Sequence, residues 1–202
     1  MEVIRALSMQ IPGLKVNALV YTQHASKSNV VLQRLNHAYN LHLIQVHEIS
    51  PDTAVMLRSK LASGEVVVIV GDRTPVSSTS PVVQVDFLGK PAPFATGPYI
   101  LAHLLECPVY LFLCTAQSGG SYTVHLESFA ERIRLPRRGR EAALQELAEH
   151  YANRLAYYAT CFPLQWYNFY DFWAQRQNPI NSSRRRLVHK SDTHEKQVHS
   201  AI

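Results

Sequence analysis

Hydrophobic and polar positions along this chain follow two periods, one typical of strands and one typical of helices. β-Branched and other apolar residues run almost without interruption from Glu65 to Gly71, which is typical of a strand buried on both faces of a sheet. Apolar residues recur every three or four positions from Arg140 to Thr160, which predicts a long amphipathic helix packed on the sheet. The pattern therefore favours an α/β fold.

Shorter patterns, turn residues and helix caps place the other elements. We expect strands at 14–21, 41–49, 65–71, 82–87, 108–115 and 121–127, and helices at 2–9, 26–36, 51–63, 97–105 and 140–160. The last two strands are predicted to pair as antiparallel neighbours across Ser118-Gly119-Gly120. Together these elements predict a mixed, mostly parallel sheet flanked by helices.

Length and composition predict one globular domain with a short tail. The chain has 202 residues, of which 47% are hydrophobic and 17% charged. After Trp173 the residues are mostly Gln, Asn, Ser, Arg and His, so we place the domain at 1–177 and a disordered basic tail at 178–202. No apolar run is long enough for a membrane span, and the first residues do not have the pattern of a signal peptide.

A candidate ligand site follows the most apolar strand. That strand ends in Gly71-Asp72-Arg73-Thr74, and ligands of open α/β sheets bind at such strand ends. Arg73 offers a planar fork of donors suited to phosphate or carboxylate, although an Asp–Arg pair could simply brace the turn. Nearby, Thr96-Gly97 opens a helix whose backbone N–H groups could hold an anion or oxyanion, or the Thr could be an ordinary N-cap.

Four stretches of the sequence resemble a known family. They are Gly64-Glu65-Val66-Val67 leading into Gly71-Asp72-Arg73, then Val85-Asp86-Phe87-Leu88-Gly89-Lys90-Pro91, then Ala95-Thr96-Gly97, and finally Gln165-Trp166-Tyr167-Asn168-Phe169-Tyr170-Asp171-Phe172-Trp173. Over roughly Met1 to Trp173 the chain resembles the late (lauroyl/myristoyl) acyltransferases of lipid A biosynthesis, within the lysophospholipid acyltransferase superfamily.

The resemblance implies an acyltransferase that moves a fatty acyl group from acyl carrier protein to a hydroxyl of a lipid A-type glycolipid. The carrier thioester is the donor substrate, and no cofactor or metal is implied. The expected location is the cytoplasmic face of the bacterial inner membrane. The implied site residues fall into three groups: Glu2 for catalysis; Asp72, Arg73, Thr74, Thr96 and Gly97 for substrate binding; and Phe87, Leu88 and Phe94 for an acyl-chain groove, unless these three are only core.

Glu2 defines the main departure from the family pattern. Enzymes of this superfamily carry a His followed, four residues later, by Asp or Glu, and the acidic residue orients the His as general base. If Glu2 is that acidic residue, the His would precede Met1, so we expect a chain that is truncated at its N-terminus and lacks its base. Glu2 could instead be a helix-start residue favoured by the macrodipole.

Two other functions stay open at this point. The chain could be a non-catalytic remnant that still binds acyl or phosphate ligands. It could also be a relative that acts on a different hydroxyl or amine acceptor, because pocket shape decides the acceptor.

The remaining chemistry adds partners but no metal site. A formal net charge of +5 suggests an anionic partner, and Arg137, Arg138 and Arg140 could meet anionic lipid. No nucleic-acid-binding module accompanies this charge. Three cysteines lack paired metal spacing and are predicted to be reduced, buried thiols. The aromatic residues from Trp166 to Trp173 favour a membrane interface or, equally, packing of the chain end onto the sheet.

Overall fold

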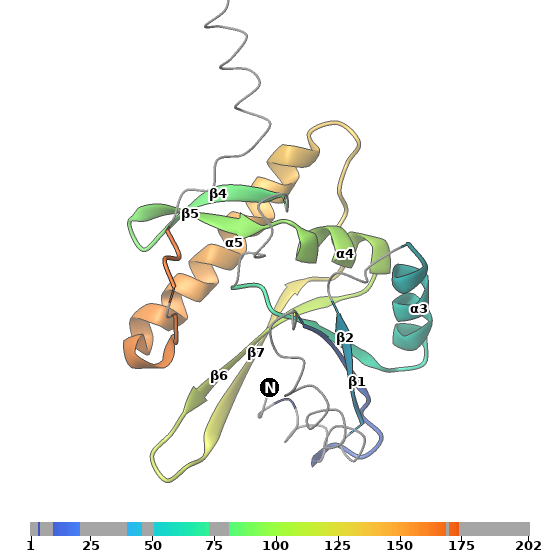
Figure 1. The fold of residues 1–202 in the computed structure, drawn as a ribbon, viewed down its shortest axis with the longest axis horizontal. Helices are drawn as coiled ribbons and strands as arrows, with labels where there is room; N and C mark the ends of the chain where they lie inside the picture. The colour runs from blue at the N-terminus through green and yellow to red at the C-terminus, as the bar shows by residue number, and fades with distance from the viewer. Residues whose placement is uncertain are drawn as a thin grey trace, which may run out of the picture.

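The computed structural model describes residues 4, 10–20, 40–45, 51–72, 81–168 and 170–173. Within that part of the chain the fold is mixed α/β, as predicted (Figure 1). The elements, in chain order, are β1 (Val16–Val20), β2 (Leu41–Gln45), α3 (Pro51–Ala62), β3 (Val66–Ile69), β4 (Val82–Phe87), β5 (Lys90–Ala95), α4 (Gly97–Leu105), β6 (Val109–Ala116), β7 (Tyr122–Ala130), α5 (Arg140–Cys161) and the 3₁₀ turn η3 (Pro163–Gln165).

A small parallel sheet has the strand order β2-β1-β3. Val16 at the start of β1 pairs with Leu41 on one side and Val66 on the other. β1 is therefore the central strand, and four of its five residues are buried. β3, which was predicted to be buried on both faces, has partners on one side only, and Val66 is 40% exposed. That prediction was wrong because the strand lies at the edge of the sheet that the structure describes.

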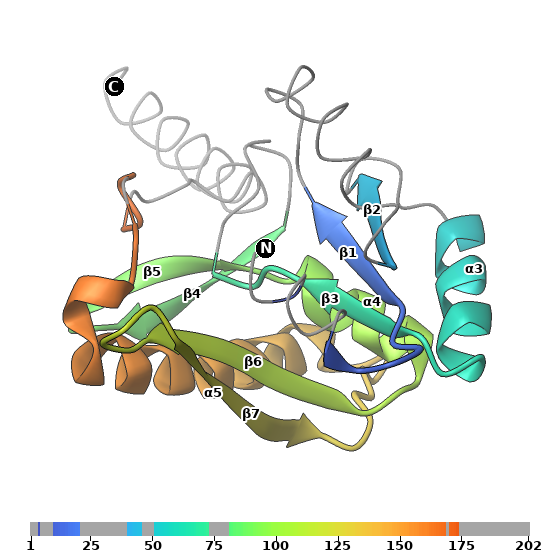
Figure 2. The ribbon, with the colours of Figure 1, turned by 90° about the horizontal axis from the view of Figure 1, so that it is seen from below.

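Helices α3 and α4 cover the parallel sheet on one side (Figure 2). Leu57 of α3 is fully buried against Leu19 of β1 and against Leu101 and Leu105 of α4. The predicted helix at 51–63 is confirmed: Pro51 occupies its first position, and Gly64 follows with a φ of +80° that favours glycine.

Two antiparallel hairpins make up the rest of the described strands. β4 and β5 are joined by Leu88 and Gly89, which have φ angles of 51° and 83°. Positive φ at both positions is the geometry of a two-residue hairpin turn. The sequence reading missed β5 because prolines, which cannot donate to a sheet, occupy two of its six positions.

The second hairpin was predicted correctly. β6 and β7 pair in antiparallel register from Val109↔Ala130 to Ala116↔Tyr122, around a turn that contains Gly119 and Gly120. The described residues form three small sheets, one parallel and two antiparallel. The predicted mostly parallel sheet is therefore not confirmed, because a tight turn reverses the chain in each hairpin.

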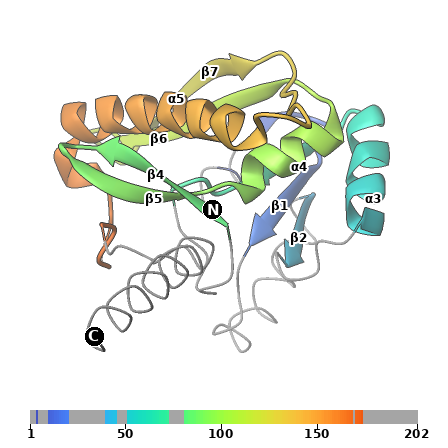
Figure 3. The same cartoon turned by 90° about the horizontal axis from the view of Figure 1, so that it is seen from above.

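Helix α5 lies between the two hairpins (Figure 3). It was predicted at 140–160, and the structure confirms it. Ala148 and Ala152 are fully buried, so their small side chains let the helix approach the strands closely. The main hydrophobic core forms around it from Val85, Phe87, Ala92, Phe94, Tyr99, Phe129, Ile133, Leu135, Leu144, Leu155 and Phe172.

Several predictions fall outside the described residues. These are most of the helix at 2–9, the helix at 26–36 and the tail at 178–202 with its domain boundary.

Candidate functional site

The end of β3 packs directly against helix α5. A Cβ placed on Gly71 would lie 3.0 Å from both Cζ and the hydroxyl oxygen of Tyr151. Real Cβ atoms essentially never approach closer than this, so the Tyr151 phenol occupies the space where any larger residue at position 71 would project. The close approach explains why glycine ends this strand.

The next residue, Asp72, is joined to the C-terminal aromatic segment. The Tyr170 hydroxyl donates a hydrogen bond of 3.2 Å to the backbone carbonyl of Asp72, across 98 positions of sequence. Two of the stretches that carry the family resemblance therefore lie together at the end of β3. Both stretches were singled out in the sequence because they resemble the same family, but no contact between them was predicted.

Tyr151 and the first turn of helix α4 share the main hydrophobic core. Burial raises the pKa of the Tyr151 hydroxyl well above its ordinary value, and the nearby Asp72, Tyr99 and Tyr170 raise it further. Tyr99 lies in the first turn of α4, is 7% exposed, and has a pKa raised by burial as well. Tyr99 belongs to the main hydrophobic core, and Tyr151 packs against that core.

Thr96 and Gly97 begin α4, as predicted, but the Thr96 hydroxyl does not cap the helix. Its Oγ1 and its backbone N–H both donate to the carbonyl of Pro81, each over 3.2 Å. Thr96 is 2% exposed, so it fastens the start of β4 to the start of α4. Gly97 is exposed, and Pro98 after it has no N–H to offer a ligand.

The three acyl-groove candidates lie in two different environments. Phe87 and Phe94 are 1% and 2% exposed and contact each other edge to face in the core. Leu88 is 46% exposed in the hairpin turn. Phe87 and Phe94 are thus core residues in the structure, which was the alternative to an acyl-chain groove.

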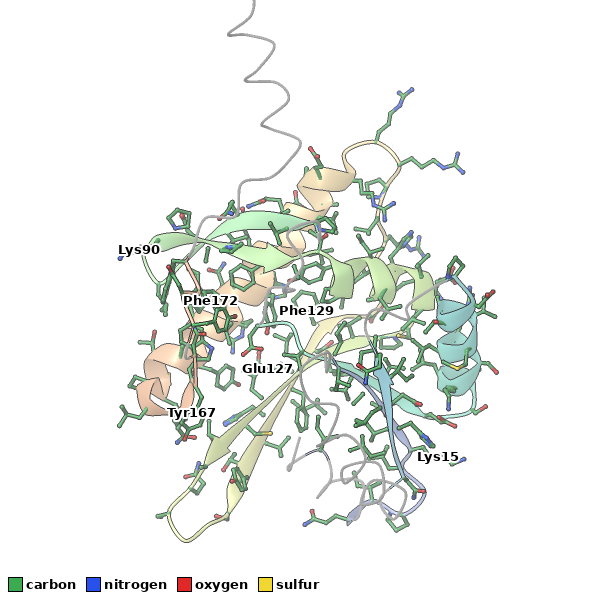
Figure 4. All side chains as sticks on the ribbon, viewed as in Figure 1. Lys15, Lys90, Glu127, Phe129, Tyr167 and Phe172 are labelled. Atoms are coloured by element: carbon green, nitrogen blue, oxygen red, sulfur yellow. The ribbon has the colours of Figure 1, made fainter. Side chains whose placement is uncertain are left out.

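The C-terminal aromatic residues pack mainly inward. Trp166, Phe172 and Trp173 contact the Phe87 ring, and the Trp173 indole N–H donates to the Phe87 carbonyl over 3.1 Å. Figure 4 shows Phe172 beside α5, whereas Tyr167, which is 67% exposed, lies toward the edge of the molecule. Most aromatic residues of this segment are therefore part of the packed interior. Tyr167 and the 89% exposed Leu164 instead lie on the outer surface.

Three predicted site residues, Glu2, Arg73 and Thr74, lie outside the described residues. Their roles remain predictions.

A charged cluster between β7 and α5 was not anticipated. Arg154 donates to both oxygens of Glu127 at 2.7 Å, and the Tyr158 hydroxyl donates to one of them at 2.5 Å. Hydrogen bonds from Arg154 and then Tyr158 lower the pKa of Glu127 to about 2. The sequence holds one weak signal for this cluster: Arg154 and Tyr158 are four residues apart and so share a helix face. Their partner Glu127 lies 27 positions before Arg154, too far away for a local pattern to relate them.

A neighbouring pair extends this cluster. His125 Nε2 lies 3.0 Å from Thr115 Oγ1, and the His125 ring packs 5.0 Å from the ring of Tyr158. Thr115 is 4% exposed, so its hydroxyl is not placed to meet a substrate. We interpret both groups as fastening the β6–β7 hairpin to α5.

Another polar cluster lies at the opposite end of the parallel strands. Glu65 accepts hydrogen bonds from the Asn17 amide at 2.9 Å and from Lys60 at 3.2 Å, and Lys15 lies 3.9 Å away. The hydrogen bond from Asn17 is the main cause of the lowered pKa of Glu65. This cluster secures the start of β3 and is separate from the candidate site.

The residues that the structure describes hold no candidate metal site and no candidate membrane span. No group of three or more His, Cys, Asp or Glu side chains is arranged to hold a metal there. No described helix is long and apolar enough to cross a membrane. All three cysteines are free; Cys107 and Cys114 are half-buried with raised thiol pKa values, but Cys161 is exposed, which corrects the expectation that all three are buried.

No protein-family model matches this chain, and a search of curated proteins found no match either.

Replacing Gly71 tests the contact between the strand end and α5. We expect Gly71→Ala to lower the free energy of unfolding by about 1–3 kcal/mol, because the new methyl group would displace the Tyr151 phenol. Gly97→Ala is the matched control, since nothing lies within 4 Å of its added Cβ. Urea unfolding of both variants makes the comparison, and equal stability would contradict the described contact.

The Glu127 cluster should make stability depend on pH. The folded-state pKa of Glu127, about 2, is below its ordinary 4.5, so its carboxylate stabilises the fold above about pH 4.5 and this contribution is lost as the pH falls toward 2. We expect Glu127→Gln to lower the free energy of unfolding by about 1–2 kcal/mol at neutral pH and by little near pH 2. The loss at neutral pH is this small because the cluster is partly exposed to solvent. Urea unfolding between pH 7 and pH 2 measures this.

The exposed Glu146 of α5, the helix that carries Arg154, provides the control for that series. Glu146→Gln should change stability little at any pH. A Glu127→Gln deficit that stays constant from pH 7 to pH 2 would show that the carboxylate charge has no role in the cluster.

Proposed function

We propose that this chain is an acyltransferase of the lipid A late-acylation type, moving a fatty acyl group from acyl carrier protein to a hydroxyl of a glycolipid. The observation that carries the proposal is the hydrogen bond from Tyr170 to the Asp72 carbonyl. It joins two of the stretches that resemble the family, at the kind of strand end where α/β proteins bind ligands. A chance resemblance in sequence would not require these distant stretches to meet.

In the proposed reaction the acceptor hydroxyl attacks the thioester carbonyl carbon. A base removes the hydroxyl proton, the C–S bond breaks, and the carrier thiol leaves with a proton while the new ester forms. Glu2 would orient the base, which is a His in the superfamily pattern. Arg73 would hold a phosphate group, which both the glycolipid and the carrier's phosphopantetheine arm can supply. Asp72, Thr74 and Gly97 would complete the substrate site, and the buried Thr96 would support its edge through the hydrogen bond to Pro81.

The proposal includes a location and a finer fold. The β2-β1-β3 sheet would belong to a mostly parallel, acyltransferase-like sheet. The protein would lie on the cytoplasmic face of the bacterial inner membrane, where the exposed Arg137, Arg138 and Arg140 suit anionic headgroups. Exposed Tyr167 and Leu164 add amphipathic and apolar surface of the kind that favours an interface.

The role of Arg73 tests this proposal. In the native protein, assayed with an acyl carrier protein thioester and a phosphorylated glycolipid, we expect Arg73→Ala to lower kcat/KM by about tenfold to a hundredfold, because one charge-assisted contact to phosphate is lost. Arg58→Ala, which removes an exposed arginine paired with Glu106, is the control and should leave turnover unchanged. Mass spectrometry of the acylated glycolipid gives the readout.

Two results would count against the proposal. Unchanged activity and substrate affinity in Arg73→Ala would remove the assigned role of that residue. Absence of acyl transfer by the native protein, with acyl or phosphate ligands still bound, would instead favour the non-catalytic remnant.

A further inference from the structure

A run of arginines lies between β7 and helix α5. We call residues 132–140 the arginine segment, which follows β7 along the chain and leads directly into the first turn of α5 (Figure 1). Five of its nine residues are arginine, and all five are exposed: Arg132, Arg134, Arg137, Arg138 and Arg140. The segment thus concentrates positive charge on one short connection.

The arginine segment is fastened to the core. Ile133 and Leu135 are only 3% and 8% exposed and belong to the main hydrophobic core. The Leu135 N–H donates to His103 Nδ1 of α4 over 3.4 Å, and the Ile133 carbonyl lies 3.3 Å from the same nitrogen. Because these apolar side chains are buried at alternate positions, Arg132 and Arg134 between them face solvent. The backbone that carries the charges is therefore held in place.

Most of this charge is not neutralised in the described part of the chain. Arg132 lies 3.7 Å from Glu106, which Arg58 also contacts at 3.0 Å. The other four arginines have no ion-pair partner among the described residues, although the exposed Glu131 and Glu141 flank the segment. Four guanidinium groups are therefore free to meet a partner outside the chain.

These charges do not stabilise the fold where they stand. Helix α5 begins at Arg140 after Gly139, and no side chain caps it. A helix N-terminus carries partial positive charge, so cations there are unfavourable, and repulsion between neighbouring guanidinium groups adds to the cost. Local features that weaken a fold are expected where a function requires them. An anionic partner would offset both effects.

The composition of the segment distinguishes between the kinds of anionic partner. Stable protein–protein interfaces are built around buried apolar or aromatic anchors, and single-stranded nucleic acids are bound by stacking on aromatic rings. The segment offers neither, because its two aliphatic residues, Ile133 and Leu135, are buried in the core and it contains no aromatic residue. Guanidinium groups alone suit phosphates spread over a surface, where each arginine adds its own attraction.

We propose that the arginine segment is the contact of this protein with an anionic lipid surface, and that this contact is made by charge without insertion into the bilayer. Helix α5 has 22 residues and is about 33 Å long, so it separates the segment from the exposed Leu164 and Tyr167 beyond its other end. The segment therefore acts without apolar help. The inference deepens the proposed function and rests on it for the identity of the membrane.

Sedimentation of the full chain with lipid vesicles tests this contact. One set of vesicles contains phosphatidylcholine alone, and the other is an equal mixture of phosphatidylcholine and phosphatidylglycerol. We expect the native protein to bind the mixture but not the neutral vesicles, and to be released as salt screens the charges. The double variant Arg137→Gln, Arg138→Gln should bind the mixture about tenfold more weakly.

The matched control is the double variant Lys15→Gln, Lys90→Gln. It removes the same charge from two exposed positions elsewhere on the molecule (Figure 4) and should bind the mixture as the native protein does. The basic residues of 184–190 stay unchanged in both variants and so do not affect the comparison. Equal losses in the two double variants would overturn the inference, because net charge would then govern binding. Unchanged binding by the arginine variant would overturn it too, as would equal binding of the native protein to neutral vesicles.

Failure of the proposed function gives a different result. If the native protein binds the mixed vesicles through the arginine segment but transfers no acyl group, the lipid contact stands and the acyltransferase proposal falls. If acyl transfer occurs and vesicle binding does not depend on the segment, only the lipid contact is wrong.

Discussion

The packing of aromatic rings around Phe87 holds the candidate site together. Phe87 ends β4 with 1% of its surface exposed, and its ring centroid lies 5.2 Å from those of both Trp166 and Phe172. The Trp173 indole hydrogen-bonds the Phe87 carbonyl from the same segment. Burial of each large side chain contributes about 1.5–3 kcal/mol, so these rings together stabilise the segment by several kcal/mol. That packing fixes the segment that carries Tyr170.

The site depends on this core in a direct way. Phe172, two residues after Tyr170, is anchored in the core and so keeps the Tyr170 hydroxyl within reach of the Asp72 carbonyl. On the other side, fully buried Ala148 and Ala152 bring α5 close to the strands, which puts Tyr151 against Gly71. The polar groups of the strand end are thus set by apolar contacts that have no chemical role of their own.

The elements that could be predicted from the sequence are those with strong local patterns. The helix at 140–160 and the hairpin around Gly119-Gly120 were predicted correctly, because periodicity and turn residues act over short distances. β5 was missed because its prolines resemble a loop. The burial of β3 was overestimated because an apolar run does not reveal whether a strand is central or at an edge.

Within the site, Asp72 could be found from its place after an apolar run. Tyr151 could not, because its position in a helical apolar stripe indicated a core residue and only the fold shows its hydroxyl beside the strand end. The partnership of Glu127 with Arg154 was equally hidden, since no local pattern relates a strand residue to a helix that follows a long loop. The long-range contacts that create the site are therefore the part that the sequence did not specify.

The measurement that tests this account most directly is urea unfolding of Tyr170→Phe, which removes the hydroxyl that bonds the Asp72 carbonyl. If the aromatic segment holds the strand end in place, this variant should lose about 1 kcal/mol of unfolding free energy, whereas Tyr122→Phe, at a 59% exposed position, should lose none. Equal stability of the two variants would contradict the account, because the C-terminal segment and the strand end would then not be joined.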